Sequence, residues 1–282
     1  LLAFGITTIR DPGGPTHATV ALRDSLRLGL VQGPRMFTAG TVIDAMEAPG
    51  MVAAVHNEAE VRAEVARQAA AGVDYVKLYA SLPAPLIRAG VDEAHRHGVR
   101  AIAHLFGTSW TDAANAGIDT IEHASLVDDE GIRMAVARKR PVWFSMDIYN
   151  TEYTQAEGAK NGVLEDNLRK DREIAQAQRD NFRKAHKAGV RMVFGSDAGV
   201  MPHGEVGKQF RVMVEYGMTP IEAIQAATRN AAQALDREKD VGAIAVGRYA
   251  DIIAVDGDPL SDVRQLEGVD AVVKGGVLVK GE

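Results

Sequence analysis

The chain has 282 residues, with 32 lysines and arginines against 38 aspartates and glutamates, a formal net charge of −6 and no cysteine. The lack of cysteine excludes disulfides, cysteine zinc fingers, iron–sulfur clusters and thiol nucleophiles, so His, Asp, Glu or Lys would have to hold any metal. Basic residues are scattered along an acidic chain, which argues against a nucleic-acid partner. No apolar run reaches the roughly 18–20 residues of a membrane helix, so no membrane partner is expected.

Short apolar or β-branched runs recur along the chain with helical stretches between them, a pattern typical of parallel strands joined by crossover helices. Four of these runs follow a helix end that contains glycine, in the segments AAAGVDY, RHGVRA, NAGIDT and KAGVRM, as is usual where a helix leads into a strand. We therefore predict an α/β fold with seven visible strands, at residues 5–10, 35–39, 74–80, 100–106, 119–124, 141–147 and 191–197.

Alternating strands and helices form either a closed barrel or an open sheet, and the reactive residues favour the barrel. Lys77, His104, His123 and Asp197 all lie toward the carboxyl ends of their expected strands, and a barrel gathers such ends at one mouth. An open nucleotide-binding sheet is disfavoured because no G-x-G-x-x-G or P-loop motif follows any strand. We expect a (β/α)8 TIM-type barrel whose strands two to eight are visible, with strand one before Leu1.

The last part of the chain has a different pattern. Two helices are expected at about 206–216 and 220–235, and the segments 241–255 and 271–279 then alternate and turn like small β-strands. We predict a barrel domain over residues 1–238 and the remnant of a β-sandwich subdomain over 239–282. Without a first strand the barrel edges would be unpaired, so a homo-oligomer is expected to cover them.

Three residues on expected strands are candidate metal ligands. Lys77 lies in an apolar strand, where it must be paired or lose its charge; it could be an ion-paired lysine, or a carbamylated lysine that binds cations as a carboxylate. His104 and His123 are 19 residues apart, one βα unit, so adjacent barrel strands would direct both imidazoles to one centre. Taken singly, each histidine could instead be a buried, hydrogen-bonded side chain.

Asp197 ends the last barrel strand in the segment RMVFGSDAG, a position suited to a ligand that also accepts a proton from water; it could equally cap the next turn. His203, six residues later, could bind substrate or a neighbouring loop. His95 and His97 form an H-x-H pair at the end of a helix, where residues two apart diverge and cannot share a metal.

Together these segments resemble the amidohydrolase superfamily, specifically its imidazolonepropionase-like and Xaa-Pro (prolidase-type) dipeptidase-like members. The resemblance covers essentially the whole chain. It is carried by the segments GITTIRDPGG, GPRMFTAG, VDYVKLYA, GIDTIEHA, DIYNTEYTQAEG, FGSDAGVMPHGE, GMTPIEAIQAATRNAA and GRYADIIAVDGDPL, in that order.

The resemblance implies a metal-dependent hydrolase with Lys77, His104, His123 and Asp197 as metal ligands, one or two zinc ions and a carboxylated Lys77. The family's H-x-H on strand one has no counterpart in this sequence. It further implies cleavage of an amide bond in a dipeptide or N-acyl amino acid, with metal-activated water and Asp197 as general base and acid. The carboxylate of such a substrate needs an anchor, and Tyr149 and His203, from their expected places in loops at the barrel mouth, are the candidate substrate-binding residues. The alternative is a truncated, impaired homologue that binds a ligand without turnover. A cytoplasmic location is favoured, with export possible.

Overall fold

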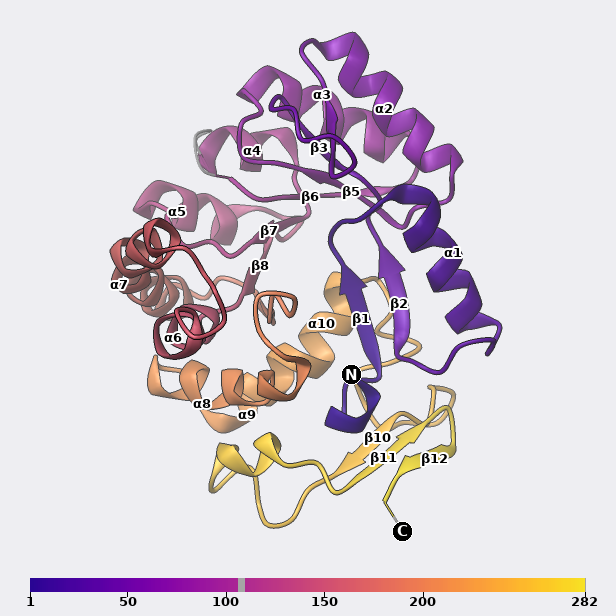
Figure 1. Ribbon diagram of the computed structural model, residues 1–282, viewed down its shortest axis with the longest axis vertical. Helices are drawn as coiled ribbons and strands as arrows, with labels where there is room; N and C mark the ends of the chain where they lie inside the picture. The colour runs from indigo at the N-terminus through magenta and orange to yellow at the C-terminus, as the bar shows by residue number, and fades with distance from the viewer. Residues whose placement is uncertain (106–109, 282) are drawn as a thin grey trace. The chain divides into compact units, whose positions relative to one another are not determined.

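A computed structural model describes residues 1–105 and 110–281, and the chain divides into two compact units. Unit 1 comprises Leu1–Thr7, His123–Val127 and Trp143–Glu282, and unit 2 comprises Thr8–Glu122 and Asp128–Val142. Figure 1 labels most of the helices and strands of both units.

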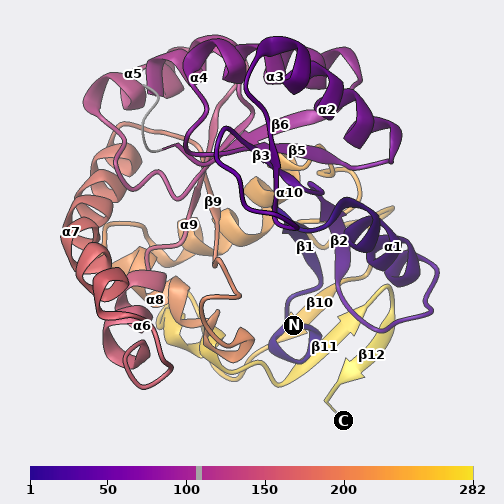
Figure 2. The same cartoon turned by 45° about the horizontal axis from the view of Figure 1, so that its top comes forward.

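Unit 2 consists of parallel strands alternating with helices. Strand β1 pairs with β2; β3 pairs with β4 and β5; β5 pairs with β6, and β6 with β7, all in parallel. Helices α2 to α5 pack one against the next alongside these strands (Figure 2). The elements are β1 (Thr8–Asp11), α1 (Thr16–Arg27), β2 (Arg35–Thr38), β3 (Val42–Asp44), β4 (Val52–Ala54), α2 (Glu58–Ala70), β5 (Tyr75–Leu78), α3 (Ala84–Arg96), β6 (Arg100–Ala103), α4 (Trp110–Ala116), β7 (Thr120–Glu122) and α5 (Asp129–Ala137).

Unit 1 carries two further parallel strands, β8 and β9, and a small antiparallel sheet with the order β10-β11-β12. Its elements are η1 (Leu2–Phe4), β8 (Trp143–Met146), α6 (Asn150–Glu157), α7 (Glu165–Lys187), β9 (Met192–Phe194), η2 (His203–Glu205), α8 (Lys208–Glu215), α9 (Pro220–Gln225), the π-helical turn η3 (Ala226–Asn230), α10 (Ala231–Ala234), β10 (Ile252–Ala254), η4 (Val263–Glu267), β11 (Ala271–Lys274) and β12 (Val277–Lys280).

The α/β prediction is confirmed, and each of the seven predicted strands overlaps an observed one. The observed strands are shorter, and Phe106, the last residue of the strand expected at 100–106, lies outside the described residues. At the four predicted junctions the glycines have φ between 70° and 91°, a left-handed conformation that side chains with a Cβ disfavour. Glycine therefore ends each helix where the sequence pattern indicates.

The interior of unit 2 contains a buried ion pair as well as apolar side chains. Arg10 on β1 and Glu122 on β7 meet at 2.5 Å, with side chains only 12% and 8% exposed. The Arg10 guanidinium also lies over the ring of Tyr75 on β5, 5.8 Å from its centroid. Strands β1 and β7 belong to different hydrogen-bonded sheets, so the pair links the β1-β2 sheet to the sheet that contains β7.

A second buried carboxylate, Asp119, stands immediately before β7. Its Oδ2 lies 2.9 Å from His95 Nε2 and accepts a 2.9 Å hydrogen bond from the backbone N–H of Ala101, while Oδ1 lies 2.6 Å from Arg140. Burial raises the pKa of Asp119, but the hydrogen bonds from His95 and Ala101 and the charge of Arg140 outweigh it, so the pKa lies below the ordinary value of 3.8. His97 pairs separately with Glu93, so the two histidines of the H-x-H pair have different partners.

The lowered pKa of Asp119 predicts an acid-sensitive contribution to stability. A carboxyl whose pKa is lower in the folded state stabilises the fold above its unfolded pKa, and this contribution is lost as the pH falls through the folded value. We expect Asp119→Asn to lower the free energy of unfolding by about 1.5–3 kcal/mol at neutral pH, with the difference shrinking below about pH 4. Urea denaturation of both proteins over a pH series measures this, and a difference that stays constant with pH would contradict it.

Among the described residues, no helix is both long and apolar enough to cross a membrane.

Candidate metal centre

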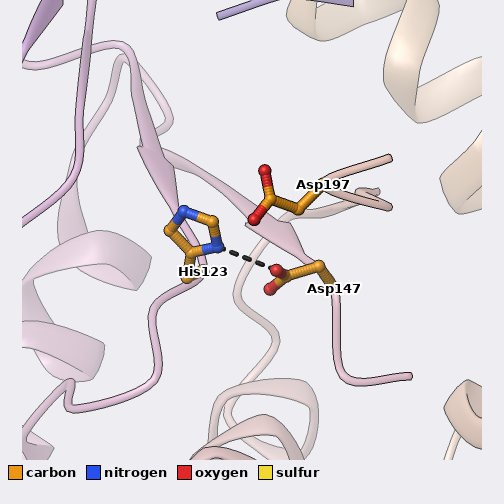
Figure 3. A group of neighbouring side chains, drawn as sticks. All are labelled: His123, Asp147 and Asp197. Atoms are coloured by element: carbon orange, nitrogen blue, oxygen red, sulfur yellow. Dashed lines mark hydrogen bonds and ion pairs between the residues drawn. The ribbon is translucent and has the colours of Figure 1, made fainter. Parts of the chain in front are cut away.

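Three polar side chains of unit 1 converge at the ends of successive strands. His123 follows β7, Asp147 follows β8, and Asp197 comes three residues after β9. One ligand atom from each lies within 4.8 Å of the other two, and Figure 3 shows the three side chains directed toward one another. An imidazole nitrogen and two carboxylates form a donor set that binds divalent cations, so this cluster fits a metal.

The backbone at this cluster adopts a conformation that is unfavourable for most residues. His123, Ala124 and Asp197 have φ of 64°, 47° and 48°, in the left-handed region that costs a residue with a Cβ about 1–3 kcal/mol. The backbone N–H of His123 donates to Ser145 O at 2.8 Å, which holds the turn against β8. Strain of this kind clusters at functional sites, and here it directs two of the three converging side chains.

Asp147 orients the imidazole of His123. Its side chain is 5% exposed, and its Oδ2 lies 2.8 Å from His123 Nδ1. Burial raises the pKa of Asp147, but the charge and hydrogen bond of His123 and the hydrogen bond from Asn150 outweigh it, so the pKa is lowered. An ionised carboxylate can only accept, so Nδ1 is the donor, and whenever the ring is neutral Nε2 has the lone pair that a cation would use.

Two amides complete the surroundings of Asp147. Gln178 Nε2 on α7 donates to Asp147 Oδ1 at 3.3 Å. Asn150 Nδ2, at the start of α6, lies 3.4 Å from Asp147 Oδ2 and 3.3 Å from Asp197 Oδ2. Asn150 therefore links the buried carboxylate of Asp147 to the exposed carboxylate of Asp197. The Asp147 oxygen that it contacts is the one that also lies against His123 Nδ1.

Sequence reasoning singled out His123 and Asp197 but missed Asp147 and Asn150. The signal that could have found Asp147 was its position, because it ends the expected strand 141–147 just as Asp197 ends the strand 191–197. Asn150 carries no such mark, since its role depends on the turn that brings it back toward both carboxylates.

The other two predicted ligands lie in unit 2. Lys77 is buried on β5, with Nζ 6.0 Å from the centroid of the Tyr79 ring. The Tyr79 ring meets the His104 ring edge to face, with centroids 4.8 Å apart. Lys77 and His104 thus flank one tyrosine, each at or just beyond the carboxyl end of its strand, as the sequence pattern predicts.

The two predicted substrate-binding residues, Tyr149 and His203, differ in their surroundings. Tyr149 is buried, and its hydroxyl donates to Glu205 Oε2 at 2.7 Å, an oxygen that Lys208 Nζ also approaches at 2.8 Å. Burial and the nearby carboxylate of Glu205 raise the pKa of Tyr149, so the hydroxyl stays protonated and can donate. His203 is exposed and begins the short helix η2 that ends in Glu205.

Comparison with known proteins places the chain in a family. The profile described as "Amidohydrolase family" matches residues 1–279. The chain belongs to the amidohydrolase family. The fold of this amidohydrolase is that of its solved relatives, which are TIM-barrel proteins, with the small antiparallel sheet at the end of the chain. The family is generally metal-dependent, in agreement with the donor set of His123, Asp147 and Asp197.

Two solved structures illustrate the similarity. A Xaa-Pro dipeptidase with methionine bound in its active site is 31% identical, with a TM-score of 0.89 over 99% of this amidohydrolase and 76% of that chain. A prolidase complexed with N-methylphosphonate-L-proline is 26% identical, with a TM-score of 0.89 over 100% of this amidohydrolase and 77% of that chain.

Among curated relatives, ochratoxinase of Aspergillus niger is 31% identical over 197 residues, which are 68% of this amidohydrolase and 40% of the relative. An uncharacterized protein of Mycobacterium tuberculosis is 29% identical over 249 residues, which are 83% of this amidohydrolase and 65% of the relative. The chain therefore spans between two fifths and two thirds of the length of these relatives.

Proposed function

We propose that the protein is a metal-dependent hydrolase that cleaves an amide C–N bond and releases a C-terminal amino acid from a dipeptide or an N-acyl amino acid. The observation that carries this proposal is the cluster of His123, Asp147 and Asp197 at successive strand ends, with strained backbone at two of them. Relatives named Xaa-Pro dipeptidase and prolidase support the substrate class.

The proposed ligands are Lys77, His104, His123 and Asp197, while Asp147 orients the His123 ring through Nδ1 instead of binding the metal. Zinc is the proposed metal, one or two ions per chain. Imidazole nitrogens, a carboxylate and a carboxylated lysine are donors that zinc accepts. A bound zinc ion would supply Lewis acidity, which acidifies water and polarises the scissile carbonyl. In the proposed reaction Asp197 takes the proton of the attacking water and returns it to the leaving amine.

Carboxylation of Lys77 is a separate proposal with its own test. A buried ammonium is costly unless it is paired or neutralised, and Lys77 is 5% exposed. Reaction of its amine with carbon dioxide would convert it into an anionic ligand. Protein incubated with 13C-bicarbonate should show a carbamate carbon signal by NMR that is absent from Lys77→Arg, and an identical signal in both proteins would contradict the assignment.

Metal content tests the proposal as a whole. Plasma mass spectrometry on purified protein of verified intact mass should find one or two zinc-like ions per chain. Hydrolysis of a panel of dipeptides and N-acyl amino acids should be lost with a chelator and restored by added zinc. Protein that binds no metal after reconstitution and hydrolyses nothing in the panel would favour the impaired homologue instead.

The proposed role of Tyr149 predicts a change in substrate affinity. In this structure its hydroxyl donates to the Glu205 carboxylate, and a substrate carboxylate would take the place of that acceptor. Hydrogen bonds to charged groups contribute about 1.5–3 kcal/mol, so we expect Tyr149→Phe to raise KM about tenfold or more with a smaller change in kcat.

Tyr153, one turn along the same helix, offers the matched control. It is also buried, and its hydroxyl accepts a hydrogen bond from Asn161 at 2.9 Å. Tyr153→Phe removes one hydroxyl from the same helix and should leave KM unchanged. A Tyr149→Phe variant whose KM matches that of the control would remove Tyr149 from the substrate site; His203→Ala tests the second predicted contact in the same assay.

A further inference from the structure

A glutamine on another helix holds the turn that carries Asp147. Gln209 lies on α8 and is fully buried. Its Nε2 donates to the backbone carbonyl of Met146 at 2.7 Å, and its Oε1 accepts from the backbone N–H of Tyr149 at 2.7 Å. These two backbone groups stand on either side of Asp147 in the chain, so one carboxamide braces both ends of the turn between β8 and α6.

Gln209 supplies a hydrogen-bond acceptor for the backbone N–H of Tyr149 at the start of α6. The first N–H groups of a helix have no partner within the helix, and the residue that caps α6, Tyr149, makes no side-chain capping bond. The Gln209 oxygen satisfies the N–H of Tyr149 instead. A buried carboxamide is stable only when its own groups are hydrogen-bonded, so the turn and the glutamine constrain each other.

The braced turn carries the groups that orient the cluster. Asp147 bonds to His123 Nδ1, and Asn150, one residue past Tyr149, reaches both Asp147 and Asp197. Among the described residues, the side chain of Gln209 bonds to backbone groups of Met146 and Tyr149. Its influence on His123 therefore passes through the backbone on either side of Asp147.

We propose that Gln209 is a positioning residue that keeps Asp147 in line with His123 Nδ1 and thereby leaves Nε2 of His123 available to a divalent cation. The expected effect of Gln209 on metal binding rests on the proposed function, because the proposed function makes His123 a ligand. The effect of Gln209 on the His123 tautomer concerns the metal-free protein and does not depend on any activity.

The test is the tautomer of His123 in metal-free protein labelled with 15N-histidine. Long-range 1H–15N NMR above the ordinary histidine pKa of about 6.5 distinguishes a protonated Nδ1 from a protonated Nε2, and the His123 signals are identified by their loss in His123→Gln. We expect Nδ1 to be protonated in the wild type. Gln209→Met, similar in volume and unable to make either bond, should show a mixture of tautomers and bind zinc about 10–100-fold more weakly.

Gln68 provides the control for a merely structural effect. It is a fully buried glutamine on α2 of unit 2, and its Nε2 donates to the backbone carbonyl of Thr41 at 2.7 Å. Gln68→Met should lower Tm by a similar amount and leave both the His123 tautomer and the zinc Kd unchanged. Gln209→Glu, which keeps the acceptor for the Tyr149 N–H and loses the donor to Met146, carries the test if Gln209→Met does not fold.

The outcomes separate the two proposals. A Gln209 variant that keeps the wild-type tautomer and zinc Kd would overturn the positioning role, as would a wild-type His123 protonated on Nε2. A change of tautomer in a protein that binds no zinc would support the positioning role and count against the proposed function. A change of tautomer together with weaker zinc binding would support both.

Discussion

The Asp197→Asn variant is expected to lose about 10²–10⁴-fold in kcat, the range that a positioned acid–base group contributes. Asparagine keeps the shape of the side chain and tolerates the left-handed backbone at φ 48°, but it cannot take a proton from water. The fold should therefore survive while the proton transfer is lost. Hydrolysis of the best substrate from the dipeptide panel measures the effect, with Tm as the check on folding.

Asp236 makes the matched control for this substitution. It is another aspartate with a positive φ, 54°, and it follows α10, whose Ala234 lies in a core cluster with Trp143 at the start of β8. Asp236→Asn should keep kcat within about twofold of the wild type. An Asp197→Asn enzyme with activity equal to that of the Asp236→Asn enzyme would show that Asp197 is not the proton acceptor.

The positions of seven strands of the α/β fold could be predicted because their signals are local. Each helix end at a glycine is specified within a few residues, and the four glycines concerned all adopt the left-handed conformation. Strands β3 and β4 were missed because no helix end at a glycine precedes them, whereas β7 and β9, which also have only three residues, each follow one. Strand β3 pairs with β5, which follows it in the chain, and β4 pairs with β3.

The candidate site could be predicted only in part, because its remaining residues depend on contacts between distant segments. His123 and Asp197 stand out by residue type and by position in their strands. The role of Asp147 becomes evident only from the ring of His123 beside it. Gln209 is 63 residues from Met146 and lies in the helical segment KQFRVMVE, where nothing marks one buried polar residue as different from its neighbours.

The partner of a predicted residue can also be invisible in the sequence. Tyr149 is a predicted substrate contact because its hydroxyl can donate, and the structure shows that donor engaged by Glu205, 56 residues later. Glu122 is a different case. It stands next to His123 in the sequence and could be taken for a metal ligand. Its carboxylate instead meets Arg10, because side chains of adjacent strand residues point in opposite directions.

Breaking the Arg10–Glu122 pair is expected to cause a large loss of stability in unit 2. Removing one partner of a buried ion pair leaves the other charge desolvated and unpaired, at a cost of about 3–5 kcal/mol. Both side chains are mostly buried, and the guanidinium is further enclosed by Tyr75. Glu122→Leu and Arg10→Met should each lower the free energy of unfolding by that amount in urea denaturation.

The double variant separates the cost of an unpaired charge from the net contribution of the pair. Replacing both partners removes both desolvation penalties, so Arg10→Met/Glu122→Leu should be far more stable than the sum of the single losses predicts. The exposed pair Arg133–Glu130 on α5 has the same 2.5 Å separation, yet its removal should leave the unfolding curve unchanged because water solvates both charges. Single-variant losses in unit 2 as small as those of the exposed pair would mean that Arg10 and Glu122 are solvated in solution, and that the space between β1 and β7 admits water.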